Sequence, residues 1–242
     1  MSLESLSAKF SLDRSRSATS QVYEFLRQAI VSLALAPGTP LSRTQVAESL
    51  DLSPMPVRDA LSRLEKEGLV EIFPQHLTRV RGIDVDSARQ VHVLRLAVEL
   101  EIVFGLATAA DPAVSKTLLA TVAKQRSCLE EDDFSGFIAF DQEFHLAMYR
   151  AARLMNVWDM IRNASGNLDR LRRLHVPLTG KAQGVMEEHT GIARAIGDGD
   201  PAGAQAWVRR HLSGTLAELD SLRERYPDYM LPIADFMEPG HG

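Results

Sequence analysis

The sequence predicts a mostly α-helical protein with two parts, a set of helices closed by a β-hairpin and then an all-helical bundle. Apolar residues recur at helical spacing through most of the 242 residues. Two short β-prone stretches lie at 69–72 and 78–81, and strand signals are absent from residue 84 onward. A chain of this length can bury two separate cores, so we expect two domains.

The composition is that of a globular protein, with 45% hydrophobic, 24% charged and 6% aromatic residues. No apolar run approaches the roughly 20 residues that cross a bilayer, and the N-terminus lacks an apolar signal core. A single cysteine, Cys128, excludes an internal disulfide and a cysteine-rich zinc cluster. These features predict a cytoplasmic protein without a membrane partner.

Charge is distributed unevenly along the chain. The net charge of −5 by itself argues against a nucleic-acid partner. Residues 1–83, however, carry 10 Lys and Arg against 9 Asp and Glu, whereas residues 84–242 carry 17 against 23. The N-terminal part is therefore slightly basic and the remainder acidic, which favours a DNA-binding domain at the N-terminus.

The first 18 residues are rich in serine and charge, and we expect them to form a flexible arm. A first helix is predicted from residue 20 to residue 33, and Pro37-Gly38 ends its apolar pattern.

Two further helices have clear start signals. Ser42 can cap the second helix, with Gln45 completing a capping box. The third helix begins at Ser53-Pro54, because proline is favoured at a first helical position, and it ends at Gly68.

The two β-prone stretches flank residues 74–77, which we expect to form the tip of a hairpin. Three helices followed by a hairpin is the order of a winged helix-turn-helix, which we assign to residues 19–83. From residue 84 to residue 225, about six or seven amphipathic helices predict an all-helical bundle. Residues 226–242 would be a C-terminal tail.

A Pro-Val-Arg-x-Ala-Leu-x-x-Leu core lies at residues 56–64, and Gly-Leu-Val follows at 68–70. This pattern, within a match that extends from Val22 to Val80, resembles the GntR family of bacterial regulators and its FadR-like branch. The resemblance implies a transcription regulator, more often a repressor than an activator, that binds a near-palindromic DNA operator as a homodimer.

In such a domain the N-terminal end of the third helix enters the major groove of DNA. Arg58 can reach a guanine edge or a phosphate there, and Ser53 suits a phosphate oxygen. The resemblance implies a major-groove and backbone set of Arg43, Thr44, Ser53, Met55 and Arg58. It implies a wing set of Gln75, His76 and Thr78.

Three positions depart from the family's pattern. Asp51 replaces a common turn glycine, Pro54-Met55 replaces an Arg-Thr pair and removes a donor to DNA, and Leu77 replaces a wing glycine. The alternative interpretation of the domain is a winged helix used for protein contact. An isolated arginine such as Arg63 is more often solvated than bound to DNA.

Motifs in the C-terminal part are Arg95–Glu99, Phe140–His145, Asn156, Glu188-His189 and Arg209–Leu212. They resemble the FCD ligand-binding domain of the same branch, and the resemblance extends to about Leu219. It implies that Asp141, His145, His189 and His211 hold a divalent metal ion at the floor of an effector cavity.

The residues agree with a metal site. Asp141 and His145 are spaced i, i+4 and so project from one face of one helix, while His189 and His211 lie on two later helices. One aspartate and three histidines make a mixed nitrogen and oxygen site suited to zinc, nickel, manganese or iron. A single histidine of this kind is more often a hydrogen-bonded core residue. The other histidines, His76, His92, His175 and His241, do not fit the pattern.

A sensing metal site needs an open coordination position. Three histidines and one aspartate on an octahedral metal leave two positions, which a carboxylate can occupy. We therefore expect a small organic acid as the effector, with Arg95 as its cationic partner, and the resemblance adds Asn156. Arg170, Arg172 and Arg173 are weaker candidates, because such a charged run usually forms a solvated face.

The chain carries no nucleophile elbow, His-Glu-x-x-His pair or phosphate-binding glycine loop, so we expect no enzyme. The predicted function is DNA binding under the control of an organic acid bound at the metal site. The alternatives are a metal-dependent hydrolase-like domain, or a purely structural helical domain, fused to the DNA-binding module. A protein-interaction adaptor would show no salt-sensitive DNA binding.

Overall fold

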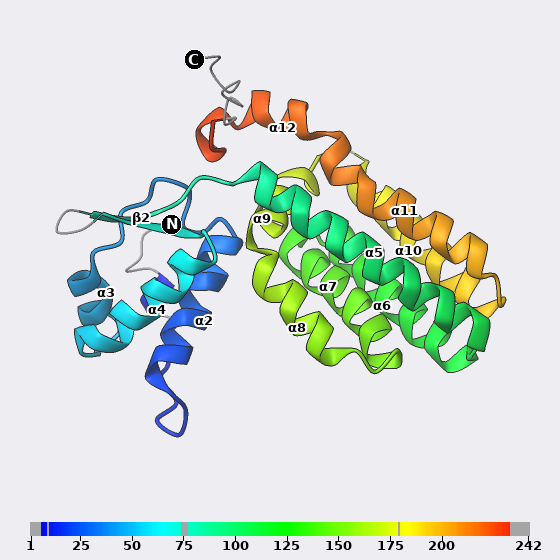
Figure 1. Ribbon diagram of the computed structural model, residues 1–242, viewed down its shortest axis with the longest axis horizontal. Coiled ribbons are helices and arrows are strands. Elements are labelled where there is room, and N and C mark those ends of the chain that lie inside the picture. The colour runs from blue at the N-terminus through cyan, green and yellow to red at the C-terminus, as the bar shows by residue number, and fades with distance from the viewer. Residues whose placement is uncertain (1–5, 9, 74–76, 179, 233–242) are drawn as a thin grey trace, which may run out of the picture. The chain divides into compact units, whose positions relative to one another are not determined.

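The computed structural model describes residues 6–8, 10–73, 77–178 and 180–232 (Figure 1). These residues divide into two compact units, each described by itself below. The smaller unit contains the described residues up to Ile30, Ala34–Val85 and the residues from Arg223 onward. The larger contains Val31–Leu33 and Asp86–Leu222.

The smaller unit consists of three helices and a β-hairpin. The helices are α2 (Ala18–Val31), α3 (Arg43–Ser49) and α4 (Pro54–Lys66), and the strands are β1 (Val70–Phe73) and β2 (Leu77–Val80). The two strands pair antiparallel, with Val70 opposite Val80. This is the winged helix-turn-helix that the sequence predicts, and the mostly helical fold class is confirmed.

Local sequence explains how α3 and α4 begin. The Ser42 hydroxyl accepts a hydrogen bond from the Gln45 backbone N–H at 3.3 Å, as its capping pattern predicts. Pro54 lies in the first turn of α4, and Ser53 is its extended N-cap residue. Between the helices, Asp51 has a φ of 53°, a left-handed conformation that aspartate tolerates better than most residues.

The described part of the expected arm lies against α2. The ring of Phe10 is 5.2 Å from that of Phe25. The backbone N–H of Asp13 donates to the Gln21 side chain at 2.8 Å, and the Gln21 amide donates back to the Asp13 carbonyl. Residues 10–17 are therefore bound to the first helix, because an aromatic pair and an exchanged pair of hydrogen bonds hold them there.

The larger unit is helical throughout its described residues. Its helices are α5 (Val85–Ala109), α6 (Pro112–Glu130), α7 (Phe134–Ala151), α8 (Met155–Ala164), α9 (Gly166–His175), α10 (Lys181–Gly197), α11 (Pro201–Ala217) and α12 (Leu219–Arg225), whose end belongs to the smaller unit. Asp111, Asp133 and Asp200 cap α6, α7 and α11 with their side chains, which explains where these three helices begin.

Helices α6, α7, α10 and α11 run alongside one another and enclose the main core of this unit (Figure 1). Phe144 and Met148 from α7, Ile192 from α10 and Val208 from α11 are all fully buried in that core. The metal-ligand candidates project from three of these same helices, so the packed core fixes the backbone from which they extend.

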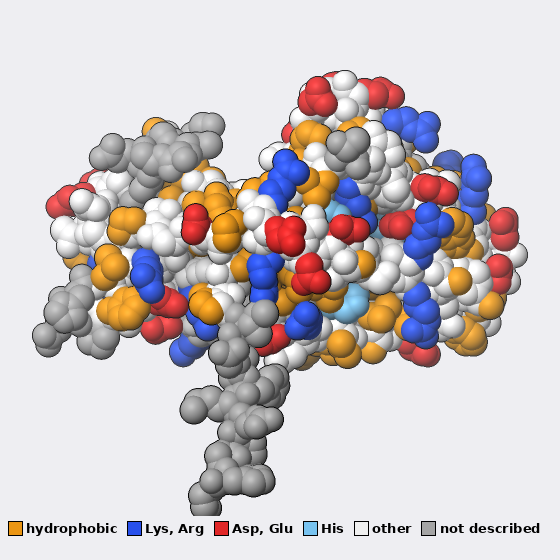
Figure 2. All heavy atoms as spheres, turned by 90° about the horizontal axis from the view of Figure 1, so that it is seen from above, with side chains coloured by type: hydrophobic (Ala, Val, Ile, Leu, Met, Phe, Trp, Pro, Cys, Tyr) orange, Lys and Arg blue, Asp and Glu red, His pale blue; other side chains and the backbone are white. Residues whose placement is uncertain are grey.

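Charged side chains of both signs are interspersed on the face shown in Figure 2. Helix α9 is different, because Arg170 is 0% exposed and Arg172 is 8% exposed. The sequence-based expectation that this run forms a solvated face is wrong for these two residues. Arg170 donates to Asn167 at 2.6 Å, and Arg172 pairs with Asp141.

Within the described ranges, no helix is long and apolar enough to cross a membrane.

The described C-terminal residues do not form a free tail. Pro227–Tyr229 is a short 3-10 helix, and Met230 forms a parallel β-bridge with Ile83. The Ile83 N–H donates to the Tyr229 carbonyl at 2.8 Å, and the Leu231 N–H donates to the Ile83 carbonyl at 3.0 Å. The start of the segment assigned to a tail is therefore part of the smaller unit.

Candidate metal centre and DNA-binding surface

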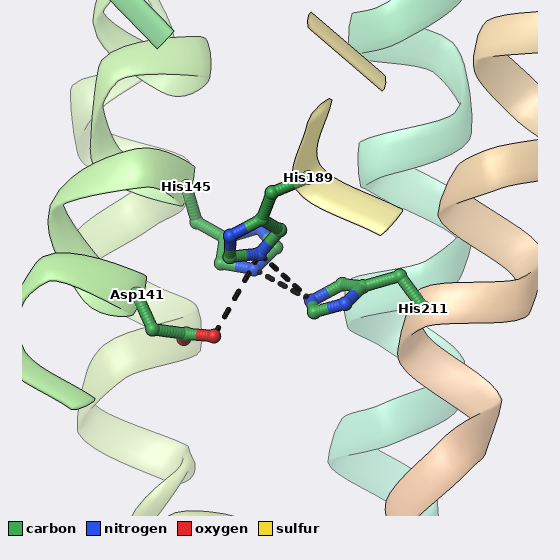
Figure 3. A group of neighbouring side chains, drawn as sticks. All are labelled: Asp141, His145, His189 and His211. Atoms are coloured by element: carbon green, nitrogen blue, oxygen red, sulfur yellow. Dashed lines mark hydrogen bonds and ion pairs between the residues drawn. The ribbon is translucent and has the colours of Figure 1, made fainter. Parts of the chain in front are cut away.

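Four side chains predicted as metal ligands meet inside the larger unit (Figure 3). Asp141 and His145 extend from α7, His189 from α10 and His211 from α11. Each offers one ligand atom, and these atoms all lie within 4.8 Å of one another. All four residues are buried, with at most 7% of any one exposed. The structure thus brings together the complete set that the sequence predicts.

The inner nitrogens of the histidines point at one another. The Nε2 atom of His211 lies 3.1 Å from Nε2 of His145 and 3.2 Å from Nε2 of His189. Asp141 Oδ1 is 3.7 Å from Nε2 of His189, and among the described residues it has no hydrogen-bond partner. One carboxylate oxygen and three imidazole nitrogens therefore share a small volume without a full set of donors.

The contacts of the outer nitrogen (Nδ1) of each histidine explain why the centre of the cluster lacks hydrogen-bond donors. His145 Nδ1 lies 2.8 Å from Glu99 Oε2, His189 Nδ1 lies 2.8 Å from Gln125 Oε1, and His211 Nδ1 lies 3.1 Å from Glu188 Oε2. Each of these oxygens is an acceptor, so the arrangement favours a proton on every Nδ1 and a lone pair on every Nε2. Three lone pairs and a carboxylate oxygen facing one another repel unless a cation lies between them. The donor set therefore fits a divalent metal ion.

Electrostatics keep these groups in their metal-binding forms. Burial lowers the pKa of His145 to about 4 and that of His189 well below its usual range, so both imidazoles are neutral at pH 7. Burial by itself would raise the pKa of Asp141, but the Arg172 guanidinium and the neighbouring histidines hold it well below its usual range. A neutral imidazole and an ionised carboxylate are the forms that coordinate metals.

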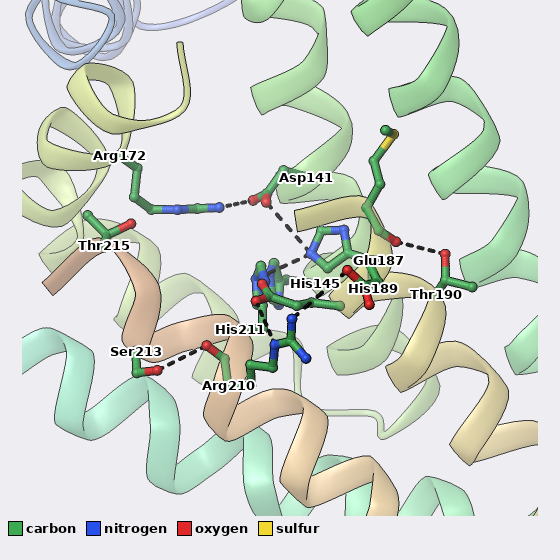
Figure 4. Close-up of polar contacts among 12 residues, drawn as sticks. Asp141, His145, Arg172, Glu187, His189, Thr190, Arg210, His211, Ser213 and Thr215 are labelled. Carbon is green, nitrogen blue, oxygen red and sulfur yellow. Dashed lines mark hydrogen bonds and ion pairs between the residues drawn. The ribbon is translucent and has the colours of Figure 1, made fainter. Parts of the chain in front are cut away.

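Two buried arginines lie beside the cluster. Arg172 from α9 forms an ion pair with Asp141 (Figure 4). Arg95 from α5 donates through Nε to Glu99 at 2.6 Å, and Glu99 in turn contacts His145. Burial opposes ionisation of Glu99, yet Arg95 and His145 lower its pKa to about 2. The cluster is thus connected to cationic side chains on two further helices.

Small cavities next to the ligands are lined by both arginines. One of about 20 Å³ is lined by Arg95, Arg172, Lys181 and His211 among others. A second, of about 10 Å³, is lined by Arg95, Arg172 and His145 among others. Each has room for about one water molecule. An organic acid therefore enters only if some of these side chains move.

The two residues predicted to bind the effector have different positions. Arg95 is buried beside the metal-ligand cluster, whereas Asn156 lies exposed in the first turn of α8 and lines neither small cavity. Sequence reasoning missed Glu99, Gln125 and Glu188. Two of them had a local signal, since Glu99 lies four residues after Arg95 and Glu188 directly precedes His189. Gln125 had none, because only the fold brings α6 to His189.

Most residues predicted to contact DNA lie on the surface of the smaller unit. Met55 is 64% exposed, and the Arg58 side chain is 62% exposed, with an ion pair to Asp59 at 3.2 Å. Arg43 and Thr44 are exposed at the start of α3. A groove of about 290 Å³ runs between that helix start and the hairpin, lined by Ser42–Gln45, Phe73, Leu77 and Thr78 among others.

Of the three wing residues predicted to contact DNA, the structure describes Thr78. Thr78 is only 6% exposed, because its side chain lies on the inner face of β2. It lines the groove next to Arg43 and Thr44, and its contact with DNA stays a prediction. Gln75 and His76 lie outside the described residues. Arg63, expected on a solvated face, places its guanidinium 3.8 Å from the centre of the Tyr23 ring.

Comparison with known proteins identifies both units. Residues 18–80 match the family of bacterial regulatory proteins called gntR, and residues 90–214 match the FCD domain. An uncharacterized HTH-type transcriptional regulator in an unstable DNA locus of Streptomyces ambofaciens is 34% identical over 86% of this chain and 87% of its own length. The HTH-type transcriptional repressor RspR of Escherichia coli K12 is 26% identical over 90% and 96%.

The fold is also found among solved structures. The McbR/YncC structure from E. coli aligns with a TM-score of 0.72, covering 87% of this chain and 99% of that chain, at 22% sequence identity. That resemblance concerns the fold alone. It agrees with three helices and a hairpin followed by a helical bundle.

Proposed function

Because the chain belongs to the gntR family of bacterial transcription regulators and carries an FCD domain, we propose that it is a metal-centred sensor of a small organic acid that controls operator binding. The family consists of regulators rather than enzymes, as the sequence predicts. The observation that carries the proposal is the convergence of three histidine Nε2 atoms and one aspartate oxygen in a buried pocket.

Asp141, His145, His189 and His211 would hold the metal, and Glu99, Gln125 and Glu188 would fix the histidine rings. The bound metal would supply a Lewis-acid centre for a carboxylate oxygen. Zinc, nickel, manganese and iron all accept this donor set. The chain's own contribution would be a buried site in which His145 and His189 are kept neutral.

The effector we propose is a small organic acid. Arg95 and Arg172 line both small cavities and Lys181 lines one, so the surroundings of the ligands are strongly cationic. The Arg172 guanidinium, which pairs with Asp141, would exchange part of that contact for the acid's carboxylate. Since the cavities are small, the acid would enter by displacing such side chains, and this displacement is a means of signalling.

The winged helix-turn-helix of the smaller unit supports DNA as a binding partner. We propose that the start of α4, with Ser53, Met55 and Arg58, enters the major groove, and that Arg43 and Thr44 contact backbone phosphates. A homodimer would read a near-palindromic operator, since two such helices match two half-sites. One relative, RspR, is named a repressor, which supports repression here. Function on DNA implies a cytoplasmic location.

A thermal-shift screen of small organic acids, run in parallel on metal-replete and chelator-stripped protein, tests the proposal. An acid at about 100 times its dissociation constant stabilises the folded state by about 2.7 kcal/mol, an easily measured increase in Tm. We expect one acid class to stabilise the replete protein only. Asp141→Ala should abolish that effect, whereas Asp159→Ala, at an exposed position on α8, should retain it. If acids stabilise both preparations equally, sensing is not metal-centred.

A further inference from the structure

The segment Asp86–Leu222 of the larger unit continues into the smaller unit at both of its ends, and both connections lead to the same residue. The first connection precedes α5, which begins at Val85 directly after Ile83 and Asp84. The second follows α12, where residues 226–231 return to pair with Ile83. Ile83 is thus the point at which two separate connections meet within the smaller unit.

The pairing at Ile83 occupies both backbone groups of that residue. Its N–H donates to Tyr229 at 2.8 Å, and its carbonyl accepts from Leu231 at 3.0 Å. Ile83 is 0% exposed and Met230 is 8% exposed. A Cβ atom on Gly82 would lie 2.8 Å from the end of the Leu231 side chain, so a larger residue at position 82 would make that side chain shift. Residues 82–83 and 229–231 are therefore joined by a buried contact with two backbone hydrogen bonds.

Each connection starts from a helix that belongs to the candidate metal site. Helix α5 carries Arg95 and Glu99, and Glu99 contacts the ligand His145. Helix α11 carries the ligand His211 and leads through α12 to the C-terminal segment. A change in the positions of His145 and His211 would therefore act on both connections, and both end at Ile83.

We propose that residues 226–231 form a coupling strap, which transmits the state of the metal site to the DNA-binding unit through Ile83. The proposal rests on the metal-centred function proposed above. The strap gives Ile83, which lies two residues before α5, two hydrogen bonds to a segment that follows α12. A change in the larger unit can therefore reach Ile83 along two routes of the chain. Metal binding would tighten both connections and so stabilise the pairing.

Amide hydrogen exchange on the full chain, with and without Zn²⁺ alone, measures this directly. In the wild type we expect Zn²⁺ to slow exchange in peptides from α7, α10 and α11 that contain the ligands. We also expect a severalfold slowing in peptides that contain Ile83 and Leu231, whose N–H groups form the pairing.

A matched pair of variants separates the strap from the site. Leu231→Pro removes the N–H that donates to Ile83, while Leu231→Ala keeps that N–H and shortens only the side chain. In L231P the Zn²⁺-dependent slowing should persist at the ligands and be lost at Ile83. In L231A it should persist at both places. A chain that ends at Arg225 should behave like L231P, which covers the case that the proline misfolds.

The outcomes are distinct for the two proposals. If Zn²⁺ slows exchange at the ligands but never at Ile83 in the wild type, or equally at Ile83 in L231P and in the shortened chain, the strap transmits nothing and this inference is wrong. If Zn²⁺ slows no peptide that contains a ligand, the metal-centred function itself fails.

Discussion

Each histidine of the cluster has a different side-chain oxygen within 3.1 Å of its outer nitrogen, from a different part of the fold. The acceptors come from α5, α6 and α10, as the contacts of Glu99, Gln125 and Glu188 record. The ligands themselves could be predicted from the sequence, because their spacing and family order carry the signal. Each acceptor lies at least 23 residues from the histidine that it contacts, so only the packed helices show which glutamate or glutamine meets which ring.

The neutral His145 makes the metal-free protein sensitive to acid. Burial lowers its pKa from 6.5 to about 4, so the unfolded chain binds this proton more readily than the folded one. The stability from the neutral ring is therefore complete above pH 6.5 and is lost as the pH falls towards 4, by roughly 3 kcal/mol at most. His175, with its pKa also lowered to about 4 by burial, adds in the same direction.

We therefore expect the Tm of chelator-stripped protein to fall between pH 7 and pH 5, before most carboxyl groups titrate. Differential scanning calorimetry across this range checks it. His145→Gln should show a smaller fall than the wild type, since it removes one of the titrating groups. An equal Tm at both pH values would mean that these histidines are not held neutral by burial.

At the scale of elements, the candidate metal site depends on how closely α10 and α11 approach. A Cβ atom on Gly191 of α10 would lie 2.3 Å from the ring of Trp207 on α11, so the two helices meet there without a side chain between them. These helices carry His189 and His211. The sequence predicted about six or seven helices in the bundle, and the described residues form eight, α5 to α12. The contact between Gly191 and Trp207 could not be predicted, because it depends on the crossing of two helices.

Gly191→Ala should push α10 and α11 apart and destabilise the protein by about 1–3 kcal/mol, as overpacking does. It should also weaken Zn²⁺ binding, since the two ligands separate. Gly184→Ala is the matched control on the same helix, because a Cβ atom there meets no atom within 4 Å. That control should leave Zn²⁺ affinity unchanged and raise stability by about 0.5–1 kcal/mol. Titration calorimetry and thermal unfolding of both variants measure the difference, and equal behaviour would refute the packing argument.

At the scale of the whole molecule, a DNA-binding unit is joined to an all-helical unit that carries the candidate metal centre. The sequence predicted this division and the winged helix-turn-helix. It did not predict that residues 10–17 bind α2 or that Met230 pairs with Ile83. Both segments are short and lack helical periodicity, so their contacts are decided by tertiary packing. The burial of Arg172 was missed for a related reason, since its partner Asp141 lies on another helix.

DNA binding by the full chain should depend steeply on salt, because Arg43 and Arg58 would replace counterions at phosphates or contact base edges. Fluorescence anisotropy on a duplex selected from a random pool by the wild-type chain measures this. Arg58→Ala should weaken binding, by about 1–3 kcal/mol if the side chain contacts a base. Arg225→Ala, at an exposed position on α12, should bind like the wild type. A salt-independent affinity would instead favour a winged helix used for protein contact.

The most direct test of metal-centred sensing is the visible absorption spectrum of the chain loaded with Co²⁺, recorded while the stabilising acid is added. Co²⁺ accepts the same nitrogen and oxygen ligands, and its absorption bands depend on the coordination shell. We predict a saturable spectral change, at the acid concentration that raises the Tm, and its loss in Asp141→Ala. An acid that stabilises the Co²⁺-loaded protein without changing the spectrum would show that it binds away from the metal, and would contradict the account.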